Sequence, residues 1–133
     1  MSFTQRAESI SGADWVWWWI DATSAYGMLV QAKRLTVNRG KWQFDFDYPN
    51  GTRTQRSRLM STAATLDLTP VYALYLGTTD YRNKERCPDG YQSGRCLACL
   101  KRSVSLMPAL LADPVIVDSA QRTYERSVAL EEL

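Results

Sequence analysis

The chain has 133 residues, of which 45% are hydrophobic and 23% are charged, a composition that excludes wholesale disorder and allows one substantial hydrophobic core. Histidine is absent, which excludes Ser-His-Asp and Cys-His catalysis and the His-containing zinc hydrolases. The formal net charge of +2 is too small to make the whole protein basic, so any attraction to nucleic acid must come from local clusters of Arg and Lys. We expect a single domain over residues 1–133.

The first predicted element is a helix over residues 2–10, with Ser2 or Thr4 as its N-cap and Gly12 ending it. Two apolar runs rich in aromatic and branched residues then flank a polar link, which predicts a β-hairpin over residues 12–35.

Polar residues stand in this hairpin where a buried strand normally has none. Asp14 opens the first strand, and Gln31 and Lys33 lie inside the second. Residues two apart project from the same face of a strand, so Gln31 and Lys33 share a face, and strand pairing brings Asp14 near them. The alternative is a polar sheet edge, with Lys33 solvated and Gln31 hydrogen-bonded inside.

Tryptophans dominate the first strand. Trp15, Trp17 and Trp19 fall on one face and Trp18 on the other. We interpret most of them as core residues of a strand buried on both sides, in preference to a surface for base stacking. Tyr48, near a turn, is a better candidate for contact with a substrate.

The next segment alternates strictly from Lys41 to Tyr48 and predicts a third strand with one wet face. A helix follows over Thr52–Leu68, stopped by Pro70, and the apolar run Val71–Leu76 has strand composition. The residues of this helix expected to face inward are Leu59, Ala63 and Leu66. Its Arg53, Arg56 and Arg58 form either a phosphate-facing row or a solvated face.

The C-terminal part is predicted to be a loop over residues 77–95 and an α/β addition over residues 96–133. We expect a helix over Cys96–Leu111, bent or shortened by Pro108, and a short strand over Val115–Val117. A last helix would run through Leu130.

Three cysteines lie in this part: Cys87, Cys96 and Cys99. An odd set without a secretory leader favours a reducing cytoplasm over a disulfide scaffold. Their spacing also resembles three quarters of a zinc site that lacks its fourth ligand, and reduced cysteines are the commoner explanation. The longest apolar run, Trp15–Ile20, is far shorter than the ~20 residues that span a bilayer, so no membrane segment is expected.

The order of these elements, with Asp14 before the second element and Gln31-Ala32-Lys33 on the third, resembles the PD-(D/E)xK nuclease superfamily. This resemblance implies a restriction-endonuclease-like core of helix, three-stranded meander, helix and strand over residues 2–76. The chain departs from the usual motif because no proline precedes Asp14 and the neutral Gln31 replaces an acid. A Q-x-K version occurs in Mrr-like and related bacterial members of the superfamily.

The resemblance also implies a site and its partners. Asp14, Gln31 and Glu8 would be ligands of Mg²⁺ or Mn²⁺, and Lys33 would activate water or stabilise the transition state. The residues that would contact nucleic acid, most simply DNA, are Gln55, Arg53, Arg56, Arg58, Arg34 and Tyr48. The implied function is a metal-dependent endonuclease in a bacterial or phage defence or mobile-element setting. The resemblance also implies a homodimer, because small nucleases of this fold often pair to cut two strands. The alternative is an inactive module of the same fold that binds nucleic acid or a protein.

Overall fold

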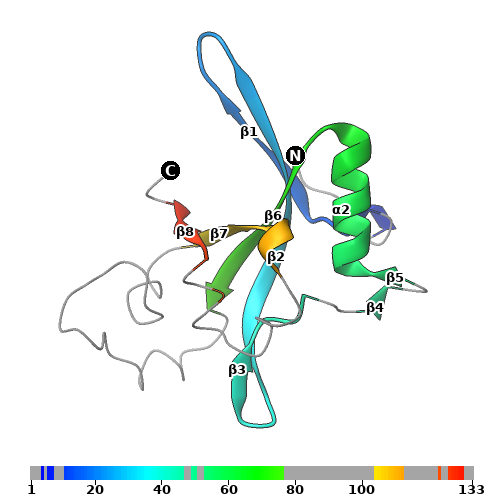
Figure 1. Ribbon diagram of the computed structural model, residues 1–133, viewed down its shortest axis with the longest axis vertical. Helices are drawn as coiled ribbons and strands as arrows, with labels where there is room; N and C mark the ends of the chain where they lie inside the picture. Colours follow the sequence, from blue (N-terminus) through cyan, green and yellow to red (C-terminus); the bar gives the residue numbers. More distant parts are fainter. Residues whose placement is uncertain are drawn as a thin grey trace, which may run out of the picture.

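The computed structural model describes residues 4, 6–7, 11–46, 49–50, 53–76, 104–112, 123 and 126–130. The protein has an α/β fold in which a mixed sheet carries the helix α2 (Gln55–Leu66) beside it (Figure 1). Within the described residues the sheet has six strands, which are β1 (Trp15–Ile20), β2 (Ala25–Asn38), β3 (Lys41–Gln43), β6 (Thr69–Leu76), β7 (Ser105–Pro108) and β8 (Val128–Ala129). Two shorter strands, β4 (Pro49–Asn50) and β5 (Arg53–Thr54), pair with each other.

The predicted hairpin is confirmed. β1 and β2 pair antiparallel from Trp15 opposite Val30 to Ile20 opposite Ala25. Figure 1 shows this hairpin extending well beyond the rest of the sheet, with its turn at the far end. Its outer half therefore has few neighbours, and the expectation that most of its tryptophans are buried is wrong for Trp18 and Trp19, which are 56% and 43% exposed.

β2 is the strand to which the rest of the sheet is attached. It pairs antiparallel with β1 and β3, and in parallel with β6 through the register Met28 opposite Thr69 to Leu35 opposite Leu76. The chain passes through α2 between β2 and β6, as a parallel pair requires a crossover connection. The sheet order is β1-β2-β6-β7-β8, with β3 attached to β2 outside this path.

Alternation along β2 separates two hydrophobic clusters. Leu29 and Leu35 belong to a cluster that includes Leu59 and Ala63 of α2. Met28 and Val30 belong to a second cluster, which contains Leu106 of β7 and is bordered by Trp15 and Trp17. The odd-numbered residues of this part of β2 thus face α2, and the even-numbered ones face away.

The helix α2 begins and ends inside the predicted range. Thr54 is its N-cap, and its side chain accepts a hydrogen bond from the backbone N–H of Ser57. Asp67 ends the helix in the left-handed conformation (φ 54°), so Pro70 does not stop it and instead lies in β6. Leu59 and Ala63 are buried as predicted, but Leu66 in the last turn is 52% exposed.

The observed strand β3 is shorter than the predicted third strand over Lys41–Tyr48. β3 ends at Gln43, yet Phe44 and Phe46 are fully buried and Asp45 between them is exposed. Side chains therefore still alternate between buried and exposed after the strand hydrogen bonds end at Gln43.

The predicted helix over Cys96–Leu111 is wrong where the structure describes it, and the predicted last helix is wrong at Val128–Ala129, although Thr123 within its range is helical. Ser105–Pro108 form β7, followed by a short 3₁₀ helix, η1 (Ala109–Leu111), and Val128–Ala129 form β8. Ser105, Leu106 and Met107 are all buried between β6 and β8, and full burial on two faces removes the period-two signal of a strand. Pro108 also disfavours helical conformation at the residue before it. The predicted strand over Val115–Val117 lies outside the described residues.

The N-terminal segment agrees with the predicted helix at the residues that are described. Arg6, Ala7 and Ser11 are helical, and the Thr4 hydroxyl accepts a hydrogen bond from the Ala7 N–H. Gly12 follows with φ +71°, the conformation that ends many helices. Among the described residues, no helix combines the length and apolar character needed to cross a membrane.

Candidate functional site

The candidate site lies on the face of β2 that is turned toward α2. Gln31 and Lys33 are 3% and 8% exposed, between Leu29 and Leu35 of the hydrophobic cluster. Each has a register partner on β6, Tyr72 for Gln31 and Leu74 for Lys33, and both partners are fully buried. β2 thus places an amide and an ammonium group in an apolar layer. Their burial destabilises the fold unless their polar atoms form hydrogen bonds or ion contacts.

The ammonium group of Lys33 reaches across to α2. Its Nζ donates a hydrogen bond to Oε1 of Gln55 at 3.0 Å and lies 6.0 Å from the centre of the Tyr72 ring. Gln55 is the first residue of α2, so the N-terminal turn of the helix is fixed to the middle of β2. The hypothesis of a solvated Lys33 at a strand edge is therefore wrong.

The carbonyl oxygen of the Gln31 side chain is in a different situation. Oε1 of Gln31 is buried and has no hydrogen-bond partner within the described part of the chain. A buried acceptor without a partner lowers the stability of a fold by about 1–3 kcal/mol. A hydrogen-bond donor or a cation bound at this oxygen would remove that cost.

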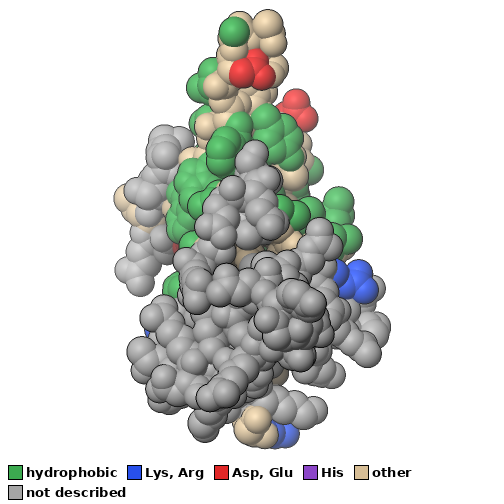
Figure 2. All heavy atoms as spheres, turned by 90° about the vertical axis from the view of Figure 1, so that its left-hand side faces the viewer, with side chains coloured by type: hydrophobic (Ala, Val, Ile, Leu, Met, Phe, Trp, Pro, Cys, Tyr) green, Lys and Arg blue, Asp and Glu red, His purple; other side chains and the backbone are tan. Residues whose placement is uncertain are grey.

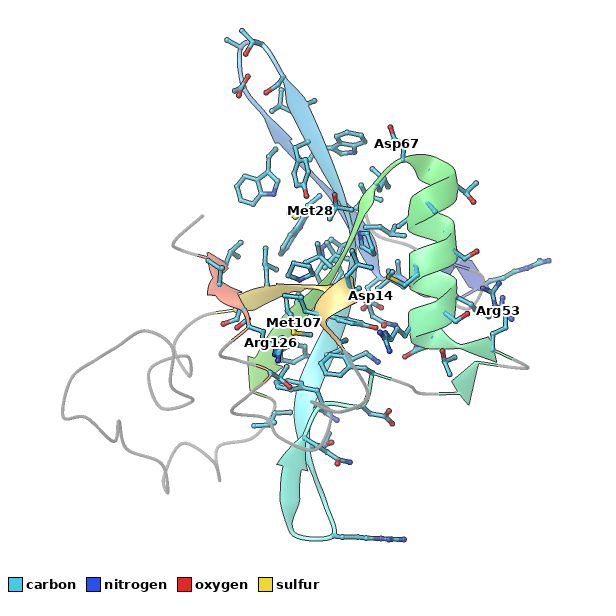
Figure 3. All side chains as sticks on the ribbon, in the orientation of Figure 1. Asp14, Met28, Arg53, Asp67, Met107 and Arg126 are labelled. Atoms are coloured by element: carbon cyan, nitrogen blue, oxygen red, sulfur yellow. The ribbon has the colours of Figure 1, made fainter. Side chains whose placement is uncertain are left out.

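Asp14 is attached to β2 by its backbone and by its side chain. Its N–H donates to the Val30 carbonyl at 2.9 Å, and its Oδ2 accepts from the Ala32 N–H at 2.6 Å. Ala32 lies between Gln31 and Lys33, so the carboxylate is held at the stretch of β2 that carries both. Figure 3 shows Asp14 where the sheet and α2 come together.

Gly12 explains how this segment approaches the helix. A Cβ atom on Gly12 would lie 2.6 Å from both the Gln55 carbonyl oxygen and the Leu59 nitrogen, and 3.0 Å from Cβ of Arg58. Only a residue without a side chain fits against the first turn of α2 at this distance. The backbone leading to Asp14 is thereby placed beside Gln55.

The predicted arginines are spread over several surfaces. Arg56 and Arg58 are half-buried on α2, and Arg53 is exposed on β5, where its guanidinium donates to the hydroxyl and carbonyl oxygens of Ser57. Arg34 is exposed and, next to Lys33 on β2, points to the opposite face of the sheet. The Cβ of Arg58 thus lies close to Gly12, while Arg34 lies on the other side of the sheet.

Comparison with protein families assigns the chain as a whole. A family model described as "Family of unknown function (DUF6615)" matches residues 1–131. The chain belongs to this family. A comparison with curated proteins gave no match.

The site of this DUF6615 member has oxygen atoms suited to a hard divalent cation. Mg²⁺ is commonly bound by one or two carboxylates together with water and phosphate oxygens. Asp14 offers a carboxylate and Gln31 an unused buried carbonyl oxygen, so the donor chemistry fits. In the described ranges, no three Cys, Asp or Glu side chains come together.

Several predicted site residues lie outside the described residues. They are Glu8, Tyr48, Cys87, Cys96 and Cys99. The third metal ligand, one nucleic-acid contact and the low-ranked zinc site thus stay predictions.

Two residues of the site were missed by sequence reasoning. Gly12 was predicted as a helix terminator only, and its close contact with α2 depends on tertiary packing that the sequence does not display. In the sequence, Tyr72 is one residue of the apolar run Val71–Leu76. Its phenol, a polar group in a run built mainly of aliphatic residues, is the signal that the sequence offers, and the structure places it opposite Gln31.

Proposed function

We propose that this protein is a metal-dependent nuclease with a restriction-endonuclease-like core. The observation that carries the proposal is the buried pair on β2: a lysine held by Gln55 and a glutamine with an unused oxygen, both next to the Asp14 carboxylate. With a divalent cation, a carboxylate, an amide oxygen and a lysine would suffice for phosphodiester hydrolysis without histidine.

The arrangement of elements supports the same proposal. A helical N-terminal segment, the β1–β2 hairpin with β3, the helix α2 and the strand β6 follow in the order expected for this core. β6 joins β2 in parallel on the side away from β1. The strands β7 and β8 extend the sheet beyond this core.

Each residue has a distinct part in the proposed reaction. Asp14 and Gln31 would hold Mg²⁺ or Mn²⁺, which when bound supplies charge for the phosphate and acidity for water. The Lys33 ammonium, positioned by Gln55, would orient water and stabilise negative charge on the phosphate oxygens. Arg58, whose Cβ lies close to Gly12, would help hold a nucleic-acid backbone, most simply that of DNA.

The test is cleavage of supercoiled plasmid and labelled single strands with Mg²⁺, Mn²⁺ or EDTA. We expect divalent-dependent cutting by the wild type and a loss of at least ~100-fold in Asp14→Asn and in Lys33→Met, the scale of removing an electrostatic catalytic group. Asp45→Asn is the charge-matched control for Asp14, because Asp45 is exposed outside the site. Arg39→Met, in the exposed β2–β3 turn, is the control for Lys33.

A folded Lys33→Met protein that still cuts at the wild-type rate would contradict the proposed role of Lys33. A circular dichroism spectrum and melting curve for each variant separate loss of chemistry from loss of fold.

A second candidate function is an inactive module that keeps this fold for binding. The observation in its favour is the 2.6 Å hydrogen bond from the Ala32 N–H to Asp14, which gives the carboxylate a structural use. Binding of DNA that is unaffected by EDTA, with no cutting under any metal, would favour this candidate.

A further inference from the structure

Trp18 is exposed although the neighbouring strand holds its ring in place. The register places Trp18 opposite Gly27, and a Cβ atom on Gly27 would lie 2.8 Å from Cζ3 and 2.9 Å from Cη2 of the indole. The ring therefore occupies the space that a side chain at position 27 would fill, while 56% of Trp18 stays exposed. An aromatic side chain ordered in advance loses little conformational entropy when a ligand binds.

Trp18 lies on the face of the sheet that carries the candidate site. Leu29, two positions along β2 from Gly27, packs in the hydrophobic cluster that includes residues of α2. Leu68 packs against the same cluster, and its Cδ2 lies beside Gly27. Gly27 and its register partner Trp18 thus face α2, as the polar residues of the candidate site on β2 do.

The other exposed aromatic residues of the hairpin face away from the site. Trp19 and Tyr26 are register partners and are 43% and 51% exposed. Being next in sequence to Trp18, Trp19 projects from the opposite face of the hairpin. Figure 2 shows hydrophobic side chains on the upper part of the viewed face, where the hairpin leaves the body of the protein.

The helix α2 extends from the candidate site to the neighbourhood of Trp18. Its first residue, Gln55, accepts the hydrogen bond from Lys33, and Leu68, just after its C-cap, lies beside Gly27. Along β2, the distance from Gly27 to Lys33 is about 20 Å at roughly 3.3 Å per residue. A nucleic-acid strand covers this distance with about six nucleotides at the 3.4 Å spacing of stacked DNA, and with fewer when it is extended.

The charges along this distance are separated in a way that suits such a strand. Arg56 and Arg58 lie in the first turn of α2, at the end nearer Lys33. Between Trp15 and Ala32 the only charged residue is Asp21, at the turn of the hairpin. Phosphates are bound by Lys and Arg, whereas the uncharged bases stack on aromatic rings. The start of α2 thus suits phosphates, and Trp18 suits a base.

We infer that Trp18 is a base-stacking residue for a single strand of nucleic acid whose backbone lies at the candidate site. In a duplex the bases are paired and stacked on one another, so an indole ring on a protein surface contacts the face of a base only where the strand is single. This inference rests on the proposed function, because the position of the strand is set by the candidate site. It replaces the interpretation of Trp18 as a core residue.

The experiment is fluorescence anisotropy of an end-labelled oligothymidylate of about 12 nucleotides with the full chain in EDTA, so that binding is measured without cleavage. We expect Trp18→Ala to raise the dissociation constant by about 5- to 100-fold, the effect of losing one stacked base, and Trp18→Phe to stay near the wild-type value. Trp19→Ala, on the opposite face, is the matched control and should leave the constant unchanged.

Two further readouts distinguish stacking from a general loss of binding. The slope of log Kd against log salt should be the same in Trp18→Ala and the wild type, because a stacked base releases no counterions. An oligothymidylate of about three nucleotides does not reach Trp18 from the site and should bind both proteins alike. A reduced salt slope or an equal loss with the short oligonucleotide overturns the inference.

Other outcomes also contradict a stacking role. Equal weakening by Trp18→Ala and Trp19→Ala, no weakening by Trp18→Ala, or no binding of the oligonucleotide at ~100 µM wild-type protein overturns the inference. Self-association that is lost in Trp18→Ala, with oligonucleotide binding unchanged, would show instead that Trp18 contacts a second copy of the chain.

The cleavage assay separates failure of this inference from failure of the proposed function. Divalent-dependent cutting, with Trp18→Ala binding the oligonucleotide as tightly as the wild type, rejects the stacking role and leaves the nuclease. Binding that depends on Trp18, without cutting under any metal, supports the stacking role and rejects the nuclease.

Discussion

The two ends of the β1–β2 hairpin both depart from the usual pattern of buried apolar and exposed polar side chains. At the inner end, Gln31 and Lys33 are polar and almost fully buried, while at the outer end Trp18 and Trp19 are aromatic and about half exposed. Burial of polar groups and exposure of several adjacent apolar groups are the informative exceptions to ordinary patterning. One hairpin thus places a candidate chemical site at its base and exposed aromatic side chains at its end.

The two ends also differ in how they are held. The inner end is enclosed by α2, β6 and the Gly12 segment, with hydrogen bonds to Gln55 and Ala32. Within the described ranges, the outer end is held by its own turn, by the Tyr26 hydroxyl, which donates to the Thr69 hydroxyl at 2.8 Å, and by Leu68, which lies against Gly27. Substitutions at the inner end should therefore cost more stability than those at the outer end.

The largest effect on stability is expected for Gly12→Ala. The added Cβ would meet backbone atoms of α2 at 2.6 Å, and φ +71° is unfavourable for alanine. We expect a loss of about 2–4 kcal/mol in the free energy of unfolding, from strain and overpacking together. Urea denaturation measures it.

Gly40→Ala is the matched control for this prediction. Gly40 has a similar φ of +78°, but nothing lies within 4 Å of its added Cβ. It should lose only the conformational part, about 1–2 kcal/mol. Equal losses in the two variants would show that the close contact of Gly12 with α2 is not what fixes the inner end.

A smaller effect of opposite sign is expected for Gln31→Leu. This change removes a buried oxygen that has no partner among the described residues, and keeps a side chain of similar volume. The free energy of unfolding should rise by about 1 kcal/mol, while any divalent-dependent cleavage falls. Denaturation and plasmid cleavage of the same preparation measure both, and a clear loss of stability would mean that the amide is needed for the fold.

The smallest effect is expected at the turn of the hairpin. The backbone N–H and hydroxyl groups of Thr23 and Ser24 donate hydrogen bonds to the Asp21 carboxylate, and they lower its pKa from the usual 3.8 to about 2. Because the pKa is lower in the folded state, this stabilisation of the turn is complete above pH ~4 and is lost as the pH falls toward 2.

An NMR titration of the Asp21 carboxyl carbon checks this prediction, with the Thr23 and Ser24 amide shifts as reporters. The amide shifts should follow the carboxyl titration in the wild type and remain constant with pH in Asp21→Asn. A midpoint near the usual value would mean that the turn is open in solution.

The inner part of the fold could be predicted from local pattern. Two apolar runs with a turn predicted the hairpin, and a period-two count placed Gln31 and Lys33 on one face. The strand Val71–Leu76 was predicted within two residues of the observed β6. These features depend on neighbours in sequence, which is why periodicity detects them.

The remainder depended on contacts between distant segments. β7 is buried on both faces, so its pattern resembles a helix as readily as a strand. Exposure of Trp18 and Trp19 follows from the hairpin extending past the sheet, which residue type alone cannot indicate. Likewise, the sequence predicts that the helix carrying Gln55 lines the site, but it does not predict the hydrogen bond between Lys33 and Gln55.

The Asp14 hydrogen bond to the Ala32 N–H has a consequence for the alignment of β2. Side chains alternate with a period of two, so a slip of β2 by one residue would turn Gln31 and Lys33 away from α2. Ala32 and Arg34 would take their places, and the inner layer would receive a bulkier guanidinium group where Gln55 now binds the Lys33 ammonium. The Asp14 carboxylate accepts a hydrogen bond from the Ala32 N–H, between the two polar residues. This bond favours the register in which Lys33 faces α2.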